Sequence, residues 1–238
     1  MQAVILAGGF GKRLKPLTDN VPKPMIVVGG IPILERQILW LKKYGVEEII
    51  LCVGYKKECI MSYFGDGRDF RAKIRYTFEE DPLGTGGALR KARESIHEEN
   101  FLFAYGDIMT DLDLNRLTKA LDSTYLAAMA AVPLRSPFGI VEMQGDKVKI
   151  FREKPILHDY WMNAGVFFFS RSIFDLLPER GSLESITLEK LAIEGKLKAV
   201  RYPQALWRSV DSHKDIEEAE KEFERAIPVA TQIDVRTK

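Results

Sequence analysis

Short apolar runs alternate with helical patterns along the first half of the chain. Four runs read as strands, at Ala3–Leu6, Glu48–Val53, Lys73–Phe78 and Phe101–Tyr105. Between them, apolar residues recur at helical spacing, which predicts helices at Ile33–Tyr44, Lys57–Phe64 and Thr85–Ile96. Strands that alternate with helices indicate an α/β fold, in which helices flank both faces of a mostly parallel sheet.

The pattern changes after about residue 112, where strands follow one another more directly. It predicts a helix at Leu114–Leu121, a strand at Leu126–Val132, a hairpin of Gly139–Met143 with Lys147–Phe151, a strand at Ala164–Phe169 and a charged amphipathic helix at Lys214–Ile227. We interpret this half as a β-rich extension built on the same sheet, because no linker separates it from the first half.

Composition narrows the classes of function. Hydrophobic residues make up 46% of the chain and charged residues 29%, which is typical of a globular protein and excludes disorder. Lys and Arg number 35 against 34 Asp and Glu, so we expect neither a nucleic-acid partner nor a membrane partner. No apolar stretch approaches the ~18 residues of a membrane span, and the N-terminus reads as a strand rather than a signal peptide, so we expect a cytoplasmic protein. The sequence leaves open whether the chain forms a homo-oligomer.

The two cysteines and three histidines form no metal-binding or disulfide pattern. Cys52 and Cys59 are seven residues apart, no CxxC is present, and the histidines are scattered. This argues against a Cys/His zinc site and against a disulfide framework.

A glycine-rich loop follows the first strand, at Gly8, Gly9 and Gly11. Glycines at such a position let backbone amides approach a phosphate closely. Four cations fall within twelve residues: Lys12, Arg13, Lys15 and Lys23. A tight turn with a solvated basic face is the alternative, and neither the Walker A nor the dinucleotide pattern is present. Prolines stiffen the loop, and we favour a clamp for a triphosphate.

A second glycine-rich segment, residues 79–88, follows the third strand and opens a helix. Its three glycines allow a flat ligand such as a nucleotide base to lie against the backbone. The alternative is a plain glycine-rich connection between strand and helix.

Acidic residues stand at the ends of two later apolar stretches. Asp107 ends the fourth strand, and Asp211 follows Leu206–Val210. Magnesium is commonly bound through one or two carboxylates together with substrate phosphates, although either acid also suits a turn or a helix cap. Glu153 and Lys154 end another strand, where they fit the hydroxyls and the anion of a sugar phosphate, or form a surface ion pair.

Six sequence elements occur in an order that resembles one enzyme family. LAGGxGxRLxPLT stands at Leu6–Thr18 and PKPM at Pro22–Met25, and LGTGGA, GD, FxEKP and NAGV follow. From Met1 to about Glu220 the chain resembles the sugar-1-phosphate nucleotidyltransferases, also called nucleoside-diphosphate-sugar pyrophosphorylases. It looks most like the mannose-1-phosphate and heptose-1-phosphate guanylyltransferases.

The resemblance implies a Rossmann-like core and the reaction of an NTP with a sugar 1-phosphate to give an NDP-sugar and pyrophosphate, with Mg²⁺. It implies one catalytic domain over residues 1–238, with a nucleotide-binding half (1–112) and a sugar-binding half (113–238). We expect no room for the C-terminal β-helix of longer relatives. GTP with mannose 1-phosphate or a heptose 1-phosphate is our first expectation. UTP or dTTP with glucose 1-phosphate is an alternative, and a non-catalytic nucleotide-sugar sensor is a remote one.

The resemblance also implies roles for individual residues. The catalytic residues would be Arg13, Lys23 and Asp107. The nucleotide would be lined by Leu6, Ala7, Gly8, Gly9, Gly11, Glu79, Gly84 and Thr85. The sugar phosphate would be held by Gly139, Glu153, Lys154 and Asn163. Mg²⁺ would be held by Asp107 and Asp211.

One element departs from the family pattern. The family often has WxDxGT, whereas this chain has Trp207-Arg208-Ser209-Val210-Asp211-Ser212. In strict register Ser209 takes the place of the family acid, and Asp211 stands two residues later. The position of Asp211 in the fold therefore decides whether it can replace that acid.

Overall fold

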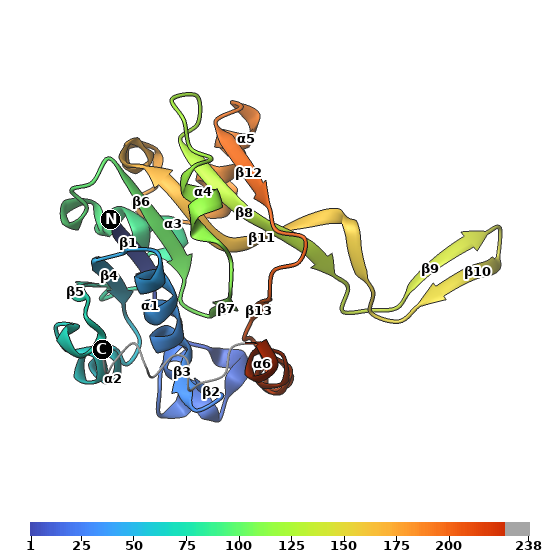
Figure 1. Ribbon diagram of the computed structural model, residues 1–238, viewed down its shortest axis with the longest axis horizontal. Coiled ribbons are helices and arrows are strands. Elements are labelled where there is room, and N and C mark those ends of the chain that lie inside the picture. The colour runs from blue at the N-terminus through green and yellow to red at the C-terminus, as the bar shows by residue number, and fades with distance from the viewer. Residues whose placement is uncertain (227–238) are drawn as a thin grey trace.

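The computed structural model describes residues 1–226, with a seven-stranded sheet in the order β12-β8-β11-β6-β1-β4-β5 (Figure 1). The strands are β1 Gln2–Leu6, β4 Glu48–Val53, β5 Lys73–Phe78, β6 Asn100–Tyr105, β8 Ala127–Arg135, β11 Ile156–Ser170 and β12 Leu197–Arg201. β11 runs antiparallel to both of its neighbours, and the other pairs are parallel. The mostly parallel sheet predicted from the sequence is confirmed.

Helices cover both faces of this sheet. They are α1 Ile33–Lys43, α2 Lys57–Phe64, α3 Gly84–Lys91, α4 Leu114–Thr118 and α5 Glu189–Ile193. A sixth helix, α6 His213–Ala226, packs in a separate cluster outside this sheet. Successive strand residues point to opposite faces. In β1, Ala3 and Ile5 therefore pack with α1 and α2, whereas Val4 packs with α3. Within residues 1–226, no helix combines the length and the apolar character that crossing a bilayer requires.

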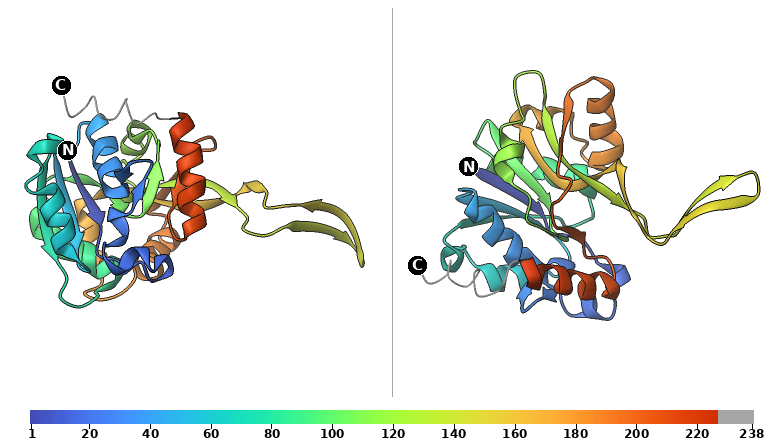
Figure 2. Two further views of the ribbon diagram at one scale, coloured as in Figure 1. Left: turned by 90° about the horizontal axis from the view of Figure 1, so that it is seen from below. Right: turned by 45° about the vertical axis from the view of Figure 1, so that its right-hand side comes forward.

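Three two-stranded ribbons accompany the main sheet. They pair β2 Val27–Val28 with β3 Ile31–Pro32, β7 Ile108–Thr110 with β13 Trp207–Ser209, and β9 Ile140–Gln144 with β10 Lys147–Arg152. The β9–β10 ribbon is the predicted hairpin, and it projects away from the body of the molecule (Figures 1 and 2). The β7–β13 ribbon brings a late segment of the chain beside the end of β6.

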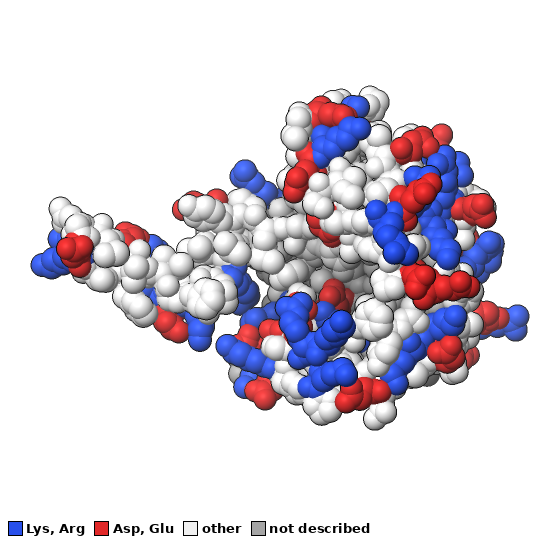
Figure 3. Space-filling model, turned by 180° about the vertical axis from the view of Figure 1, so that it is seen from behind, with Lys and Arg blue, Asp and Glu red and all other residues white. Residues whose placement is uncertain are grey.

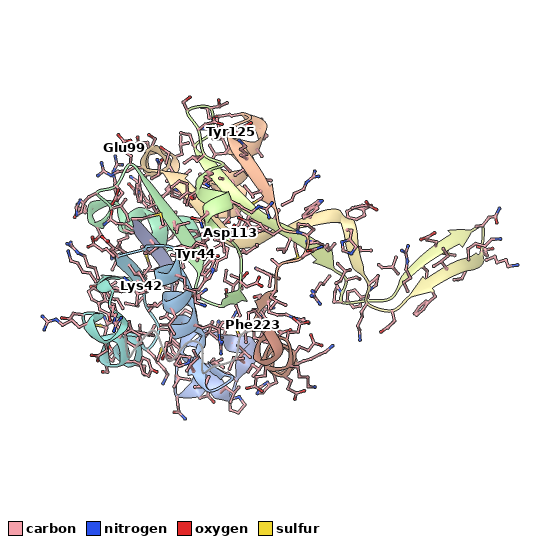
Figure 4. The ribbon with its side chains drawn as sticks, viewed as in Figure 1. Lys42, Tyr44, Glu99, Asp113, Tyr125 and Phe223 are labelled. Carbon is pink, nitrogen blue, oxygen red and sulfur yellow. The ribbon has the colours of Figure 1, made fainter. Side chains whose placement is uncertain are left out.

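The C-terminal helix α6 packs on the basic N-terminal loop. Phe223, labelled in Figure 4, and Ala219 are buried in one cluster with Leu14, Ile26 and Val210. The amphipathic pattern predicted this helix from Lys214 to Ile227. It begins at His213, and Ile227 lies outside the described residues.

Several element boundaries differ from the prediction. The helix predicted at Thr85–Ile96 ends at Lys91 and is followed by a 3₁₀ turn, and the helix predicted at Leu114–Leu121 ends at Thr118. The strand predicted at Ala164–Phe169 is part of the longer β11. The sequence analysis did not predict β7, β12, β13, α5 or a π-helix at Leu183–Leu188.

The proposed division between the two halves, at residue 112, falls between β7 and α4. β6 from the first half pairs with β11 from the second, so one sheet runs across the division.

Candidate functional site

A cleft of about 1050 Å³ opens at the carboxyl ends of four strands. Leu6 at the end of β1, Gly54 after β4, Glu79 after β5 and Gly106 after β6 all line it. Ligands of open α/β sheets bind at this edge, where the loops that follow parallel strands meet. Figure 3 shows the molecule hollowed near its middle, with basic side chains gathered along one edge of the hollow.

Ten of the residues singled out from the sequence line this cleft. They are Leu6, Gly8, Gly9, Lys23, Glu79, Gly84, Thr85, Asp107, Asn163 and Asp211. The residues that do not line it are Ala7, Gly11, Arg13, Gly139, Glu153 and Lys154. Of these, Ala7 is buried in the core beneath the cleft, and Arg13 reaches the site through a contact with Asp211.

Cations of the basic loop meet the two predicted metal acids. The ammonium of Lys23 donates to Asp107 Oδ2 at 2.5 Å and to Asp211 Oδ1 at 2.8 Å. Arg13 donates to the same Asp211 oxygen at 2.7 Å. The side chain of Lys23 is only 11% exposed, whereas each carboxylate is about one-third exposed. Four residues that lie up to 198 positions apart thus form one cluster with balanced charge.

The β7–β13 ribbon places Asp211 in this cluster. Ser209 pairs with Ile108, and the amide of Val210 donates to the carbonyl of Asp107 at 2.9 Å. Ser209, which stands in register with the family acid, donates its hydroxyl to Asp211 Oδ2 at 2.7 Å. The shifted acid therefore reaches the site, and the residue in the family position supports it.

Asp211 is not the cap of the terminal helix. The helix begins at His213, so Ser212 holds the preceding position, and its hydroxyl accepts from the amide of Asp215 at 3.3 Å. Asp215 in turn accepts from the Ser212 hydroxyl and from the Asp211 amide. This reciprocal arrangement leaves the carboxylate of Asp211 free to turn into the cleft.

The surroundings of Asp211 favour its charged form. Burial would raise the pKa of this carboxyl, but hydrogen bonds from Lys23 and Ser209 and the charges of Lys23 and Arg13 outweigh burial and lower it. Asp211 is therefore an anion at neutral pH.

The first glycine loop combines an open and a packed glycine. A Cβ on Gly9 would meet no atom within 4 Å, so the backbone of Gly9 is accessible to a ligand. Gly11 has φ +59° and lies against Thr18 and Lys23, where a Cβ would come within 2.8 Å of the Thr18 methyl group. Gly11 thus closes the loop on Lys23 instead of lining the cleft.

Glu79 presents a hydrogen-bond acceptor to the cleft. Its Oε2 accepts from the amide of Leu83 at 2.9 Å, which closes the turn before α3. Its Oε1 lies near Gly8, since a Cβ built on that glycine would be 3.3 Å from this oxygen.

All three glycines of the second glycine segment pack against another part of the chain, residues 178–181. A Cβ on Gly87 would lie 2.5 Å from the carbonyl oxygen of Glu179, and one on Gly86 would lie 2.8 Å from Pro178. The amide of Gly86 also donates to the carbonyl of Gly181 at 2.9 Å. Gly84 lines the cleft and also packs on this segment, because a Cβ on Gly84, at φ +75°, would lie 2.5 Å from the carbonyl oxygen of Gly181. All three glycines therefore let the 178–181 segment approach α3. The interpretation that all three receive a flat ligand is replaced for Gly86 and Gly87, which do not line the cleft.

Replacing Gly87 with alanine is expected to lower the free energy of unfolding by about 1–3 kcal/mol, since the new methyl group must displace backbone. Urea denaturation measures the change. Gly9→Ala is the matched control and is expected to keep wild-type stability, because nothing occupies the space of its methyl group. Equal stability of the two variants would contradict this packing account.

The predicted sugar-phosphate residues separate into two groups. Asn163 lines the cleft, and its Oδ1 accepts from the amide of Gly165 at 2.8 Å. Gly139, Glu153 and Lys154 lie at the base of the β9–β10 hairpin, outside the lining of the cleft. Lys154 and Glu153 form an ion pair at 3.4 Å with both side chains more than half exposed, which is the alternative that the sequence left open.

The two acids have the donor chemistry of a magnesium site that is completed by ligands from outside the chain. Within residues 1–226, no three His, Cys, Asp or Glu side chains gather into a group that could hold a metal by itself. Asp107 and Asp211 nevertheless converge on one cation, the ammonium of Lys23. Two carboxylates with substrate phosphates are a usual shell for Mg²⁺, so the donor set is suitable.

Sequence reasoning missed several residues of the cleft. Phe10, Tyr55, Tyr105, Glu184 and Trp207 line it. The position of Tyr105 at the end of a predicted strand was a usable signal. Glu184 carried none, because it lies in the unpredicted π-helix.

Comparisons with known proteins cover almost the whole chain. The family model described as Nucleotidyl transferase matches residues 2–226. A D-glycero-alpha-D-manno-heptose 1-phosphate guanylyltransferase of Aneurinibacillus thermoaerophilus is 33% identical over 232 residues, which are 95% of this chain and 100% of that protein. A Bacillus subtilis protein named probable glucose-1-phosphate cytidylyltransferase is 32% identical, over 93% of this chain and 95% of its own.

A solved structure shares the fold. HddC from Yersinia pseudotuberculosis, complexed with GMP-PN, matches with a TM-score of 0.73 and 28% identity, covering 93% of this chain and 99% of that one.

Proposed function

Since the chain belongs to the nucleotidyl transferase family and is an enzyme of sugar-1-phosphate nucleotidyl transfer, we propose that it joins GTP to mannose 1-phosphate or a heptose 1-phosphate, with release of pyrophosphate. The convergence of Lys23, Asp107 and Asp211 at the cleft carries the proposal. A non-catalytic sensor would not require this cluster.

The reaction follows from positioning and charge neutralisation. An oxygen of the sugar phosphate attacks the α-phosphorus, the bond from that phosphorus to the β-phosphate oxygen breaks, and pyrophosphate leaves. The attacking phosphate is already an anion, so neither a general base nor a covalent enzyme intermediate is required. We assign Lys23 to the reacting phosphates and Arg13 to the β- and γ-phosphates, which become the leaving group.

Asp107 and Asp211 are the residues that we propose hold Mg²⁺. When bound, the ion neutralises charge on the phosphates. The basic loop supplies its own cations to the same carboxylates, so the chain holds both acids in place before a ligand enters. Gly9, which lines the same cleft, leaves room for phosphate oxygens.

Glu79 supports guanine as the base. A carboxylate only accepts hydrogen bonds, and guanine presents two neighbouring donors, its N1–H and its 2-amino group. Uracil and thymine present one N–H between two carbonyl oxygens, which a carboxylate repels. Glu79 therefore disfavours the UTP and dTTP alternatives.

CTP is the second candidate. The amino group of cytosine can also donate to a carboxylate, and the Bacillus subtilis relative carries a cytidylyltransferase name at nearly the same identity as the guanylyltransferase relative.

Release of pyrophosphate from each of GTP, CTP, UTP and dTTP, paired with mannose, heptose and glucose 1-phosphates, tests the proposal. The largest kcat/KM is expected for GTP with a manno-configured sugar phosphate. A larger value for CTP with glucose 1-phosphate would replace our assignment with the second candidate.

Glu79→Gln is expected to lower kcat/KM for GTP about tenfold and to raise the ratio of UTP to GTP turnover, because an amide matches the mixed donors and acceptors of uracil. The amide oxygen can still accept from Leu83, so the turn is kept. Glu58→Gln on the exposed face of α2 is the control. An unchanged UTP to GTP ratio would remove Glu79 from base selection.

A further inference from the structure

Glu184 lines the cleft but has no role in the proposed reaction. Its carboxylate accepts hydrogen bonds from hydroxyl groups of three different segments. Its Oε1 accepts a short hydrogen bond from Tyr105. Its Oε2 accepts from Thr85 at 2.7 Å and from Ser182 at 2.6 Å. Tyr105 ends β6, Thr85 opens α3, and Ser182 precedes the π-helix of Leu183–Leu188.

This carboxylate is held without a cation. Within residues 1–226, it forms no ion pair with a Lys, Arg or His side chain, and it is half-buried. Burial would raise the pKa of Glu184, but the hydrogen bonds from Ser182, Tyr105 and Thr85 outweigh burial and lower it. A carboxylate that accepts three hydrogen bonds from hydroxyl groups fixes the directions of those hydroxyls.

Two of the three partners, Thr85 and Tyr105, are each fixed by a second contact. Thr85 Oγ1 accepts from the amide of Leu183 at 2.8 Å, which ties the start of α3 to the π-helix. The ring of Tyr105 lies against Gly165, where a Cβ would come within 2.6 Å of the ring. Tyr105 therefore has little freedom to move away from Glu184.

The hydrogen bonds of Glu184 link two parts of the cleft, the proposed nucleotide-binding wall and the strand end near the proposed metal ligand. Thr85 follows Gly84 on the nucleotide side, and Tyr105 is two residues before Asp107. The backbone between Tyr105 and Asp107 is held in place, because the amide of Gly106 donates to the carbonyl of Leu6 at 2.8 Å. A shift of Tyr105 or Thr85 would thus change the distance between the nucleotide wall and the strand end that carries Asp107.

We propose that Glu184 is a positioning residue that sets this distance through Tyr105 and Thr85, and so acts on nucleotide binding and turnover without touching the reacting atoms. The inference rests on the proposed function, in that it takes the cleft to bind a nucleoside triphosphate. π-Helical segments often occur at functional sites, and the one that carries Glu184 borders the cleft.

The test measures steady-state kinetics and nucleotide affinity for Glu184→Ala, Glu184→Gln and the exposed control Glu189→Ala. For Glu184→Ala we expect KM for the nucleotide and its calorimetric Kd to rise about tenfold, the effect of losing one or two hydrogen bonds to a charged group. We expect kcat to fall less than KM rises, and KM for the sugar phosphate to stay within about twofold.

The conservative variant separates positioning from mere stability. Glu184→Gln keeps an oxygen that accepts from Tyr105 and an amide group that can donate to the hydroxyl of Thr85 or Ser182, so it is expected to recover most of the lost affinity. A double-mutant cycle with Tyr105→Phe is expected to be non-additive in the nucleotide Kd.

A purely structural role predicts a different result. Glu184→Ala would then lower the thermal unfolding midpoint, but the folded fraction, measured well below that midpoint, would keep its nucleotide Kd and KM. That outcome would overturn the inference, as would an additive cycle. If wild-type protein released no pyrophosphate with any substrate pair, the proposed function would fail first. The nucleotide Kd of the variants would still decide the role of Glu184.

Discussion

Asp107→Ala is expected to lower the rate of pyrophosphate release by about 10³-fold or more while the protein stays folded. Asp107 follows β6 by two residues, lines the cleft and accepts a hydrogen bond from Lys23 at 2.5 Å. Its loss removes one of two proposed magnesium ligands and one of two anions that hold Lys23. Its side chain is about one-third exposed, so water can fill the space that the carboxylate leaves.

The measurement is coupled detection of pyrophosphate at saturating substrate, with circular dichroism to verify the fold. Asp69→Ala is the control, because this acid is exposed in a turn outside the cleft. Activity of Asp107→Ala within tenfold of wild type would exclude Asp107 as a metal ligand. Higher Mg²⁺ concentrations are expected to restore little activity, because the ligand itself is missing.

Lys23→Met is expected to reduce kcat by about 10²–10³-fold. Lys23 is the buried cation that both acids share, and methionine matches its length without its charge. Among the described residues that line the cleft, Lys23 is the only buried Lys or Arg, since Lys57 is partly exposed. The fold is expected to persist, since neither carboxylate is fully buried.

The pH dependence gives this variant a second readout. Lys23 contributes to the low pKa of Asp211, so removing it allows burial to raise that pKa. A raised pKa means that Asp211 takes up a proton at higher pH, and the acid limb of the pH–rate profile is expected to move upward.

Lys15→Met is the matched control for this loop. Lys15 does not line the cleft, is 63% exposed and, within residues 1–226, forms an ion pair with Asp19 alone, so its loss is expected to change kcat less than about twofold. If both lysine variants lost activity equally, the effect would come from the net charge of the loop and not from the position of Lys23.

Much of the charge cluster could be predicted from the sequence, because its members stand in short recognisable segments. Lys23 and Arg13 belong to a basic loop after the first strand, and Asp107 ends the fourth. In a parallel sheet the segments after the strands meet at one edge, so these residues were expected to converge. The structure places them together, and their catalytic roles stay predictions.

The contacts between distant segments could not be predicted in this way. The sequence attributes Gly86 and Gly87 to a ligand, whereas the structure packs them against residues 178–181. Nothing in a linear pattern indicates that backbone from that segment lies there. Glu184 was missed for the same reason, since its partners come from three separate elements.

The sequence by itself determined the family, the alternation of strands and helices, and the chemical identity of the cations and acids, because local periodicity and contiguous motifs carry that information. Only the tertiary structure decided that Asp211 reaches Lys23 across 188 positions, through the short β7–β13 ribbon. It also decided that the hairpin base with Glu153 lies outside the lining of the cleft. Both outcomes depend on strand pairing and packing between distant segments, which no local pattern encodes.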